Sequence, residues 1–159
     1  MNRISRGCVG RAIYQGAKVV ADAVMQNIEN LPIDNRRVKE GQLLHGITQQ
    51  QKDGLIKGFG IAPMEEDGGY RHVKLGFDGY SDIIENRGYV DGKAITVYNS
   101  NKNPEHRVPN AVIARTTNKG SSNLPAQPFM DRTIEVSRDK VEQAIMEQFA
   151  KELDKLWSK

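Results

Sequence analysis

The sequence predicts an α+β fold, in which a small and mainly antiparallel sheet packs with a long N-terminal helix and a long C-terminal helix. Apolar residues recur at helical spacing over residues 9–28 and again from Pro128 almost to the end of the chain. The sheet is indicated by Val73, Leu75 and Phe77, which alternate with polar residues or glycine as in a half-buried strand. Together these observations predict the fold class.

The first predicted helix, residues 9–28, is rich in small side chains. Gly16 lies inside it, at a cost of about 1 kcal/mol relative to alanine in a helix interior. Together with Ala17, Ala21 and Ala23, it would let another helix approach closely. We expect the C-terminal helix to be that partner.

The C-terminal helix is predicted to begin at Pro128, which fits the first helical position. Its roughly 28 residues would reach on the order of 40 Å at about 1.5 Å per residue. Some other part of the chain must cover its apolar stripe. The predicted stripe consists of Phe129, Thr133, Ile134, Val141, Ala144, Ile145, Phe149, Leu153 and Leu156.

Two shorter helices are predicted between the long ones. Thr48 and Gln51 have the spacing of a capping box and open a helix that ends near residues 58–60. A second segment, residues 109–115, favours a short helix over a strand, because it has proline at its start and Gly120 as a stop signal beyond its end.

A hairpin is predicted around the acidic turn at residues 65–69, which leads into the strand at residues 73–77. The partner strand is expected at about residues 60–64. Beyond the hairpin, residues 78–108 are rich in Gly, Asn, Asp and Lys, apart from a strand-like stretch at 94–98, and predict a long loop or arm that orders against neighbours. At 159 residues one core is enough, so residues 1–159 are expected to form a single domain.

Composition limits the function classes. The net charge is +3, but 23 Lys and Arg are interspersed with 20 Asp and Glu, whereas dedicated duplex binders concentrate positive charge. A single cysteine, Cys8, cannot close an intrachain disulfide and fits a reducing compartment. The N-terminus has no signal-peptide core, and no stretch approaches 18 apolar residues. We therefore expect a soluble protein made in a cytoplasm, with no membrane partner.

No constellation of catalytic residues stands out. The histidines, at positions 45, 72 and 106, lack the paired spacing of a zinc site, and Glu65 and Glu66 are expected to be solvated in a turn. Cys8 is expected to precede the first helix, as a thiol of no special reactivity. The glycines of GFGIAP and GFDGY match no phosphate-binding loop. The sequence therefore predicts no enzyme, with no catalytic, cofactor-binding or metal-binding residues and no cofactor.

The aromatic residues leave an alternative open. Tyr70, Phe77, Tyr80, Tyr89 and Tyr98 could form a stacking platform for single-stranded nucleic acid. Their basic neighbours are few, which favours strand packing and loop anchoring. A nucleic-acid-binding module is therefore the alternative function.

Three stretches carry a family resemblance: TQQQKDGLIKGFGIAPM, GGYRHVKLGFDGY and PNAVIARTTNKGSSNLPAQPFMDRTIE. Over roughly residues 9–155 the chain resembles the tail-component proteins of long-tailed phages typified by gene product ten of coliphage HK-ninety-seven. The last stretch is the most specific, with its Gly- and Ser-containing segment, its Pro-Ala-x-Pro-Phe and its terminal helix.

The resemblance implies a structural virion protein of the neck or upper tail, present in the host cytoplasm during assembly. It implies a role in tail completion or head-tail joining, as a subunit of a homo-oligomeric ring, a hexamer or dodecamer, around the DNA channel. The expected partners are sister subunits, neighbouring neck, connector or tail-tube proteins, and DNA passing through the lumen without sequence-specific binding. Head-to-tail interfaces that close produce such rings.

Overall fold

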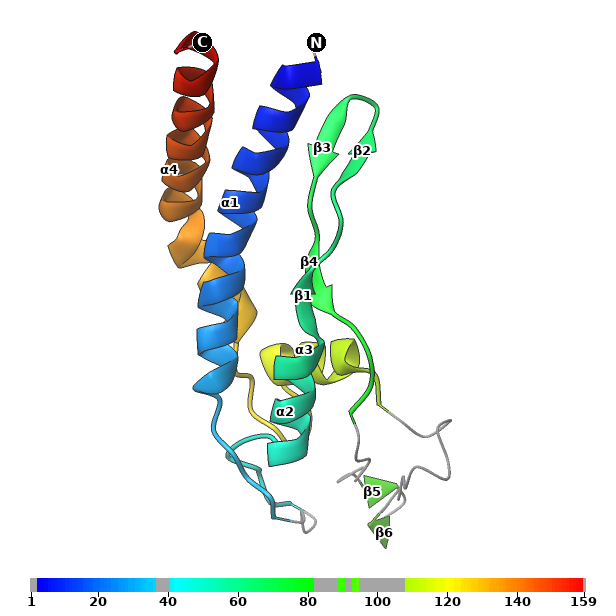
Figure 1. The fold of residues 1–159 in the computed structure, drawn as a ribbon. Helices are drawn as coiled ribbons and strands as arrows, with labels where there is room; N and C mark the ends of the chain where they lie inside the picture. The colour runs from blue at the N-terminus through cyan, green and yellow to red at the C-terminus, as the bar shows by residue number, and fades with distance from the viewer. Residues whose placement is uncertain (1–2, 37–40, 82–88, 91–92, 95–107, 159) are drawn as a thin grey trace.

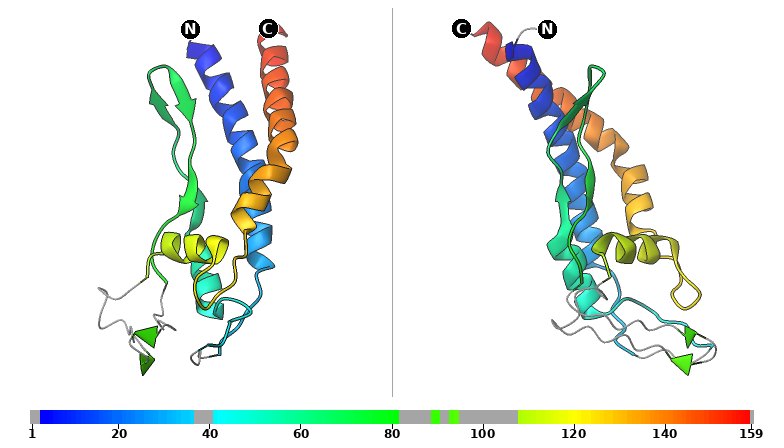
Figure 2. Two further views of the ribbon diagram at one scale, coloured as in Figure 1. Left: turned by 180° about the vertical axis from the view of Figure 1, so that it is seen from behind. Right: turned by 90° about the vertical axis from the view of Figure 1, so that its right-hand side faces the viewer.

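The computed structural model describes residues 3–36, 41–81, 89–90, 93–94 and 108–158, and it confirms the predicted α+β class. Two long helices, α1 (Arg3–Glu29) and α4 (Phe129–Trp157), run antiparallel, so both ends of the chain lie at one end of an elongated molecule (Figure 1). Two short helices, α2 (Gln49–Gly58) and α3 (Asn110–Lys119), lie toward the opposite end. A β-hairpin extends from there along α1, on the side away from α4 (Figures 1 and 2).

The strands form antiparallel pairs rather than one continuous sheet. The hairpin contains two pairs, β1 with β4 and β2 with β3, and a third pair, β5 with β6, lies in the segment beyond it. The bounds are β1 (Phe59–Ile61), β2 (Glu65–Asp67), β3 (Tyr70–His72), β4 (Leu75–Phe77), β5 (Tyr89–Val90) and β6 (Lys93–Ala94). The predicted strand pairing across the acidic segment is therefore present.

The predicted turn at residues 65–69 was too long. Residues 65–67 form strand β2, and the chain reverses at Gly68 and Gly69, whose φ angles of 55° and 86° suit glycine. The predicted strand at 73–77 was also too long, because only residues 75–77 form a strand, β4, and residues 73 and 74 lie between β3 and β4. Three residues separate β1 from β2 on one side of the hairpin, but only two separate β3 from β4 on the other. The first side therefore has one extra residue, as in a β-bulge. The extra residue lies next to Pro63, which has no backbone N–H to donate to the ladder.

The hydrophobic core lies at one end of the molecule, where the C-terminal end of α1 meets α2, α3 and the start of α4. Ile28 and Leu55 are fully buried there. The other core residues are Val24, Leu31, Leu44, Ile47, Ile113, Ala114, Leu124 and Phe129. Among the described residues, the opposite half of the molecule consists of α1, α4 and the hairpin, and this thin arrangement leaves apolar side chains uncovered.

The predicted pairing of the long helices is confirmed. Gly16 is the point of close approach, since a Cβ added there would lie 2.7 Å from Ile145 Cγ1 and 3.1 Å from Val141 Cγ1. Near the core, Asn27 Nδ2 donates to Thr133 Oγ1 at 2.6 Å. Helix α1 begins at Arg3, earlier than the predicted residue 9. Its apolar periodicity is visible only over residues 9–28, but the helix extends further along α4.

The residues of the predicted apolar stripe of α4 lie on two different faces of the helix, one covered and one exposed. Phe129 and Thr133 are buried, but Ile134, Phe149, Leu153 and Leu156 are exposed. The surface that meets α1 instead follows spacings of three and four residues through Ser137, Val141, Ala144, Gln148 and Glu152. Val141 and Ile145 pack against Gly16 at this surface, and small or polar side chains occupy its other positions.

The short helices follow their predicted signals. Thr48 and Gln51 form the expected capping box of α2, with Gln51 N donating to Thr48 Oγ1 at 3.1 Å. Helix α3 confirms the helix expected after Pro109 and ends before Gly120, which has a φ of 82°. Pro128 is the N-cap of α4 rather than its first helical residue.

The cap of α4 comes from α3. Asn118 Oδ1 accepts hydrogen bonds from the backbone N–H groups of Met130 at 3.0 Å and of Asp131 at 3.4 Å. Pro128 has no side-chain oxygen to serve this purpose. The buried Asn118 therefore joins the two helices at the base of the molecule.

Most of the predicted arm at 78–108 lies outside the described residues. Its two ends are held together, because Ser81 N donates to Val108 O at 3.1 Å and Asn110 N donates to Gly79 O at 3.0 Å. The strand-like stretch at 94–98 overlaps β6 at Ala94, and its other residues also lie outside the described part.

Candidate functional site

The histidines and paired glutamates do not form a site. His45 lies exposed in a loop, His72 Nε2 lies 3.0 Å from Glu65 Oε2 on the hairpin, and His106 is outside the described residues. Lys74 and His72 lower the pKa of Glu65 through hydrogen bonds. Glu66 pairs separately with Arg71. Within the described part of the chain, no group of three or more His, Cys, Asp or Glu could hold a metal ion.

Cys8 was expected to precede the first helix, but it lies inside α1 and is only 2% exposed. Its sulfur lies 3.9 Å from Glu152 Oε2 and 3.8 Å from an Arg11 nitrogen. A buried thiol inside a helix gains nothing from the positive end of the helix dipole.

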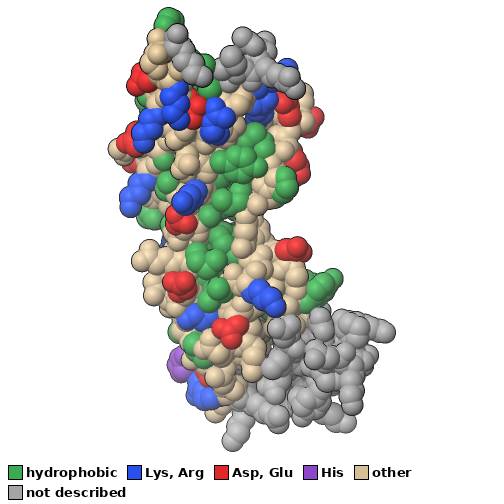
Figure 3. All heavy atoms as spheres, viewed as in Figure 1, with side chains coloured by type: hydrophobic (Ala, Val, Ile, Leu, Met, Phe, Trp, Pro, Cys, Tyr) green, Lys and Arg blue, Asp and Glu red, His purple; other side chains and the backbone are tan. Residues whose placement is uncertain are grey.

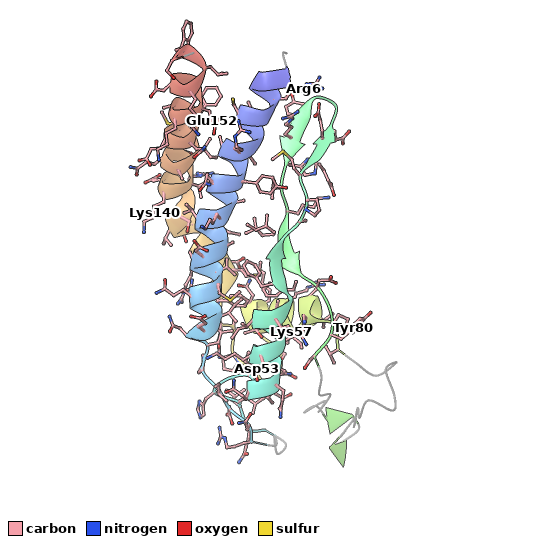
Figure 4. All side chains as sticks on the ribbon, in the orientation of Figure 1. Arg6, Asp53, Lys57, Tyr80, Lys140 and Glu152 are labelled. Carbon is pink, nitrogen blue, oxygen red and sulfur yellow. The ribbon has the colours of Figure 1, made fainter. Side chains whose placement is uncertain are left out.

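Glu152 is the centre of a polar contact that the sequence did not reveal. Its carboxylate points from α4 toward α1 (Figure 4), and it accepts a hydrogen bond from Arg11 Nη2 at 2.6 Å and one from Gln148 Nε2 at 2.8 Å. The Arg11 hydrogen bond is the main reason that the pKa of Glu152 falls to about 2. Because the Glu152 carboxylate is paired with Arg11 of α1, this cluster links the two helices.

A second buried carboxylate, Asp34, organises the loop that follows α1. It accepts hydrogen bonds from Arg36 Nε at 2.9 Å and from the backbone N–H of His45 at 2.9 Å. These bonds lower the pKa of Asp34 well below its usual range. The group is fully engaged within its own chain, so it too serves structure.

The uncovered apolar surface of α4 is the most distinctive feature of the described chain. We call this surface the α4 seam and define it by Met146, Phe149, Leu153, Leu156 and Trp157. Met146 is 71% exposed, Phe149 39%, Leu153 38%, Leu156 42% and Trp157 85%. Met146, Phe149, Leu153 and Leu156 recur every three or four residues and Trp157 follows Leu153 by four, so the five lie on one side of the helix. Phe149 and Leu153 each follow a residue of the α1 interface by one position, which is about 100° around the helix.

A second unusual surface lies on the hairpin. A groove of about 560 Å³, here called the glycine groove, is lined by Gly58, Gly60, Ile61, Ala62, Pro63, Lys74, Leu75, Gly76, Phe77 and Asp78. None of the residues that line it belongs to α1. Gly60 and Gly76 are directly paired in the β1–β4 ladder, and a Cβ added at either would meet no atom within 4 Å.

These two glycines have no conformational reason to be glycine, because neither is among the glycines with positive φ. A glycine inside a strand lowers stability by roughly 0.5–1 kcal/mol relative to alanine. The GFGIAP and GFDGY stretches thus contribute Gly60 and the neighbouring Gly76 to a bare strand surface. Such glycines often mark a site where another chain approaches closely.

The aromatic residues are not brought together in the part of the chain that is described. Phe77 packs in the core beside Phe59 and Phe129, with ring centroids 5.1 Å and 6.3 Å away. Tyr70 is 81% exposed next to the hairpin turn, and Tyr80 is 56% exposed beyond the hairpin's other end. The side chain of Tyr89 and the whole of Tyr98 lie outside the part of the chain that the structure describes. The expected packing role is confirmed for Phe77.

The surface between α1 and the hairpin is also partly apolar. In Figure 3 hydrophobic side chains form an interrupted band down the middle of the face, with charged side chains at its edges. Tyr14 is 39% exposed, and its hydroxyl oxygen accepts a hydrogen bond from Met64 N at 2.9 Å. Arg71 donates to the backbone oxygen of Arg6, so two contacts hold the hairpin against α1.

No family model, curated protein or solved structure matches this chain. Among the described residues, no helix combines the length and the apolar character needed to cross a bilayer. The α4 seam and the glycine groove are the candidate interaction surfaces of the described chain.

Proposed function

We propose that this protein is a structural virion protein of a long-tailed bacteriophage, which acts in tail completion or head-tail joining as a subunit of a ring around the DNA channel. The observation that carries the assembly role is the α4 seam, because monomeric proteins rarely leave a continuous row of large apolar side chains in water. The phage setting rests on the sequence resemblance over residues 9–155.

Several features of the described chain support an assembly subunit over an enzyme. Its buried carboxylates, Glu152 and Asp34, are fully paired within the chain, and its core is confined to one end. The remaining half presents long helices and a hairpin, elements that offer large surfaces to neighbours (Figure 2).

The test is removal of the coding sequence from the phage genome that carries it. We expect filled heads and finished tails that fail to join, and recovery of joined particles when the purified protein is added to the lysate. Normally joined, infective particles in the absence of the protein would refute the proposal. A nucleic-acid-binding module predicts a different result: steeply salt-dependent binding of short DNA by the isolated chain.

A further inference from the structure

The α4 seam and the glycine groove have matching lengths. From Met146 to Trp157 the seam spans about 17 Å at the helical rise. From Gly58 to Pro63 the floor of the groove spans about 17 Å at the strand rise. The seam is a convex row of bulky side chains, and the groove is a hollow surface that lacks side chains at its centre.

The two surfaces lie on opposite flanks of the molecule. Helix α1 separates α4 from the hairpin in both the front and the back view (Figures 1 and 2). One chain therefore cannot bring its own seam to its own groove. The seam of one copy can reach the groove of a second copy. An open chain of copies then has one free seam and one free groove at its ends.

We propose that the α4 seam of one copy docks in the glycine groove of the next copy, as the repeating head-to-tail interface of the assembly. This inference rests on the proposed function, since a ring requires an interface between two different surfaces. It gives Gly60 and Gly76 a role, because the absence of Cβ atoms lets a neighbouring helix approach the β1–β4 ladder more closely.

The apolar area of the α4 seam agrees with docking of a second copy of the chain. The seam exposes on the order of 500 Å² of apolar surface, taking roughly 200 Å² for each fully exposed large side chain. A stable interface buries about 800 Å² on each partner, and the centre of such an interface is mostly apolar. The seam is thus large enough for the centre of an interface, with the neighbouring charged residues at its rim.

Pairing of two α4 seams is the competing arrangement. It would form a closed dimer and would leave the open faces of Gly60 and Gly76 without a purpose. The groove arrangement accounts for both surfaces, and the two arrangements predict opposite results when mutants are mixed.

The experiment uses the full chain and sedimentation velocity over a range of concentrations. Gly76→Val fills the groove, Leu153→Asp places a charge in the seam, and Val136→Asp is the matched control. Val136 is 72% exposed on α4 but lies off the seam. Valine suits a strand and has open space at position 76, so Gly76→Val should keep or raise the melting temperature. If it does not, Gly60→Val is the second groove variant.

We expect the wild type and Val136→Asp to form oligomers, and Gly76→Val and Leu153→Asp each to sediment as monomers. An equimolar mixture of the two monomeric variants should form one-to-one dimers, because the intact seam of the first fits the intact groove of the second. A mixture that stays monomeric, a groove variant that still assembles, or a wild type that is monomeric even at about 1 mM overturns the inference. Joined phage particles made without the protein would instead overturn the proposed function.

Discussion

Replacing Gly16 with alanine tests whether the close approach of α1 and α4 determines stability. The new Cβ would lie 2.7 Å from Ile145 Cγ1 and 2.8 Å from Ile145 Cδ1. Carbon atoms prefer separations of about 3.5–4.0 Å, so the overlap is near 1 Å. Overpacking of this kind costs roughly 1–3 kcal/mol, and alanine returns about 1 kcal/mol of helix propensity. We expect a net loss of about 1 kcal/mol.

Gly10 supplies the matched control in the same helix. It is also buried, but a Cβ there would meet its nearest atom, Met64 Sδ, at 3.6 Å, which is an ordinary contact. Gly10→Ala should therefore raise stability by up to about 1 kcal/mol.

Urea unfolding followed by circular dichroism measures both free energies of unfolding, and a thermal melt should separate the two variants by about 4–8 °C. The reasoning fails if Gly16→Ala is as stable as Gly10→Ala. It also fails if Ile145→Ala, which removes the clashing atoms, does not reduce the loss caused by Gly16→Ala.

Two further predictions concern the polar contacts between elements. Asn118→Ala removes the cap of α4 and should lower the free energy of unfolding by about 0.5–2 kcal/mol in urea titrations. The control, Asn123→Ala, affects only an exposed hydrogen bond to Ser122 and should change this free energy by less than about 0.5 kcal/mol. Equal losses in the two variants would contradict the capping role. Glu152 has a folded pKa of about 2, below that of an ordinary glutamate, so its contribution to stability is present above about pH 4.5 and disappears as the pH falls toward 2. The melting temperatures of wild type and Glu152→Gln should accordingly differ at neutral pH and converge in acid, and a difference that is constant with pH would show that the Arg11 contact is not responsible.

Local sequence signals predicted the elements because each signal acts over a few residues. The Thr48–Gln51 capping box, the stop at Gly120 and the alternation before Phe77 all correspond to elements of the fold. The errors occurred where distant contacts matter. The cap of α4 comes from Asn118 of another helix, and near the start of α1 both Cys8 and Arg11 contact Glu152 of α4.

The sequence by itself determined that two long helices would pair through small residues and that a hairpin would accompany them. Only the tertiary structure decided which side of α4 meets α1. Helical periodicity places Phe149 and Leu153 among the apolar positions, but it cannot say whether the partner covers them. The close approach at Gly16 selects the face with Ser137, Ala144 and the buried Glu152, whose charge is matched by Arg11. The large apolar side chains are consequently left outside, where a neighbouring molecule can reach them.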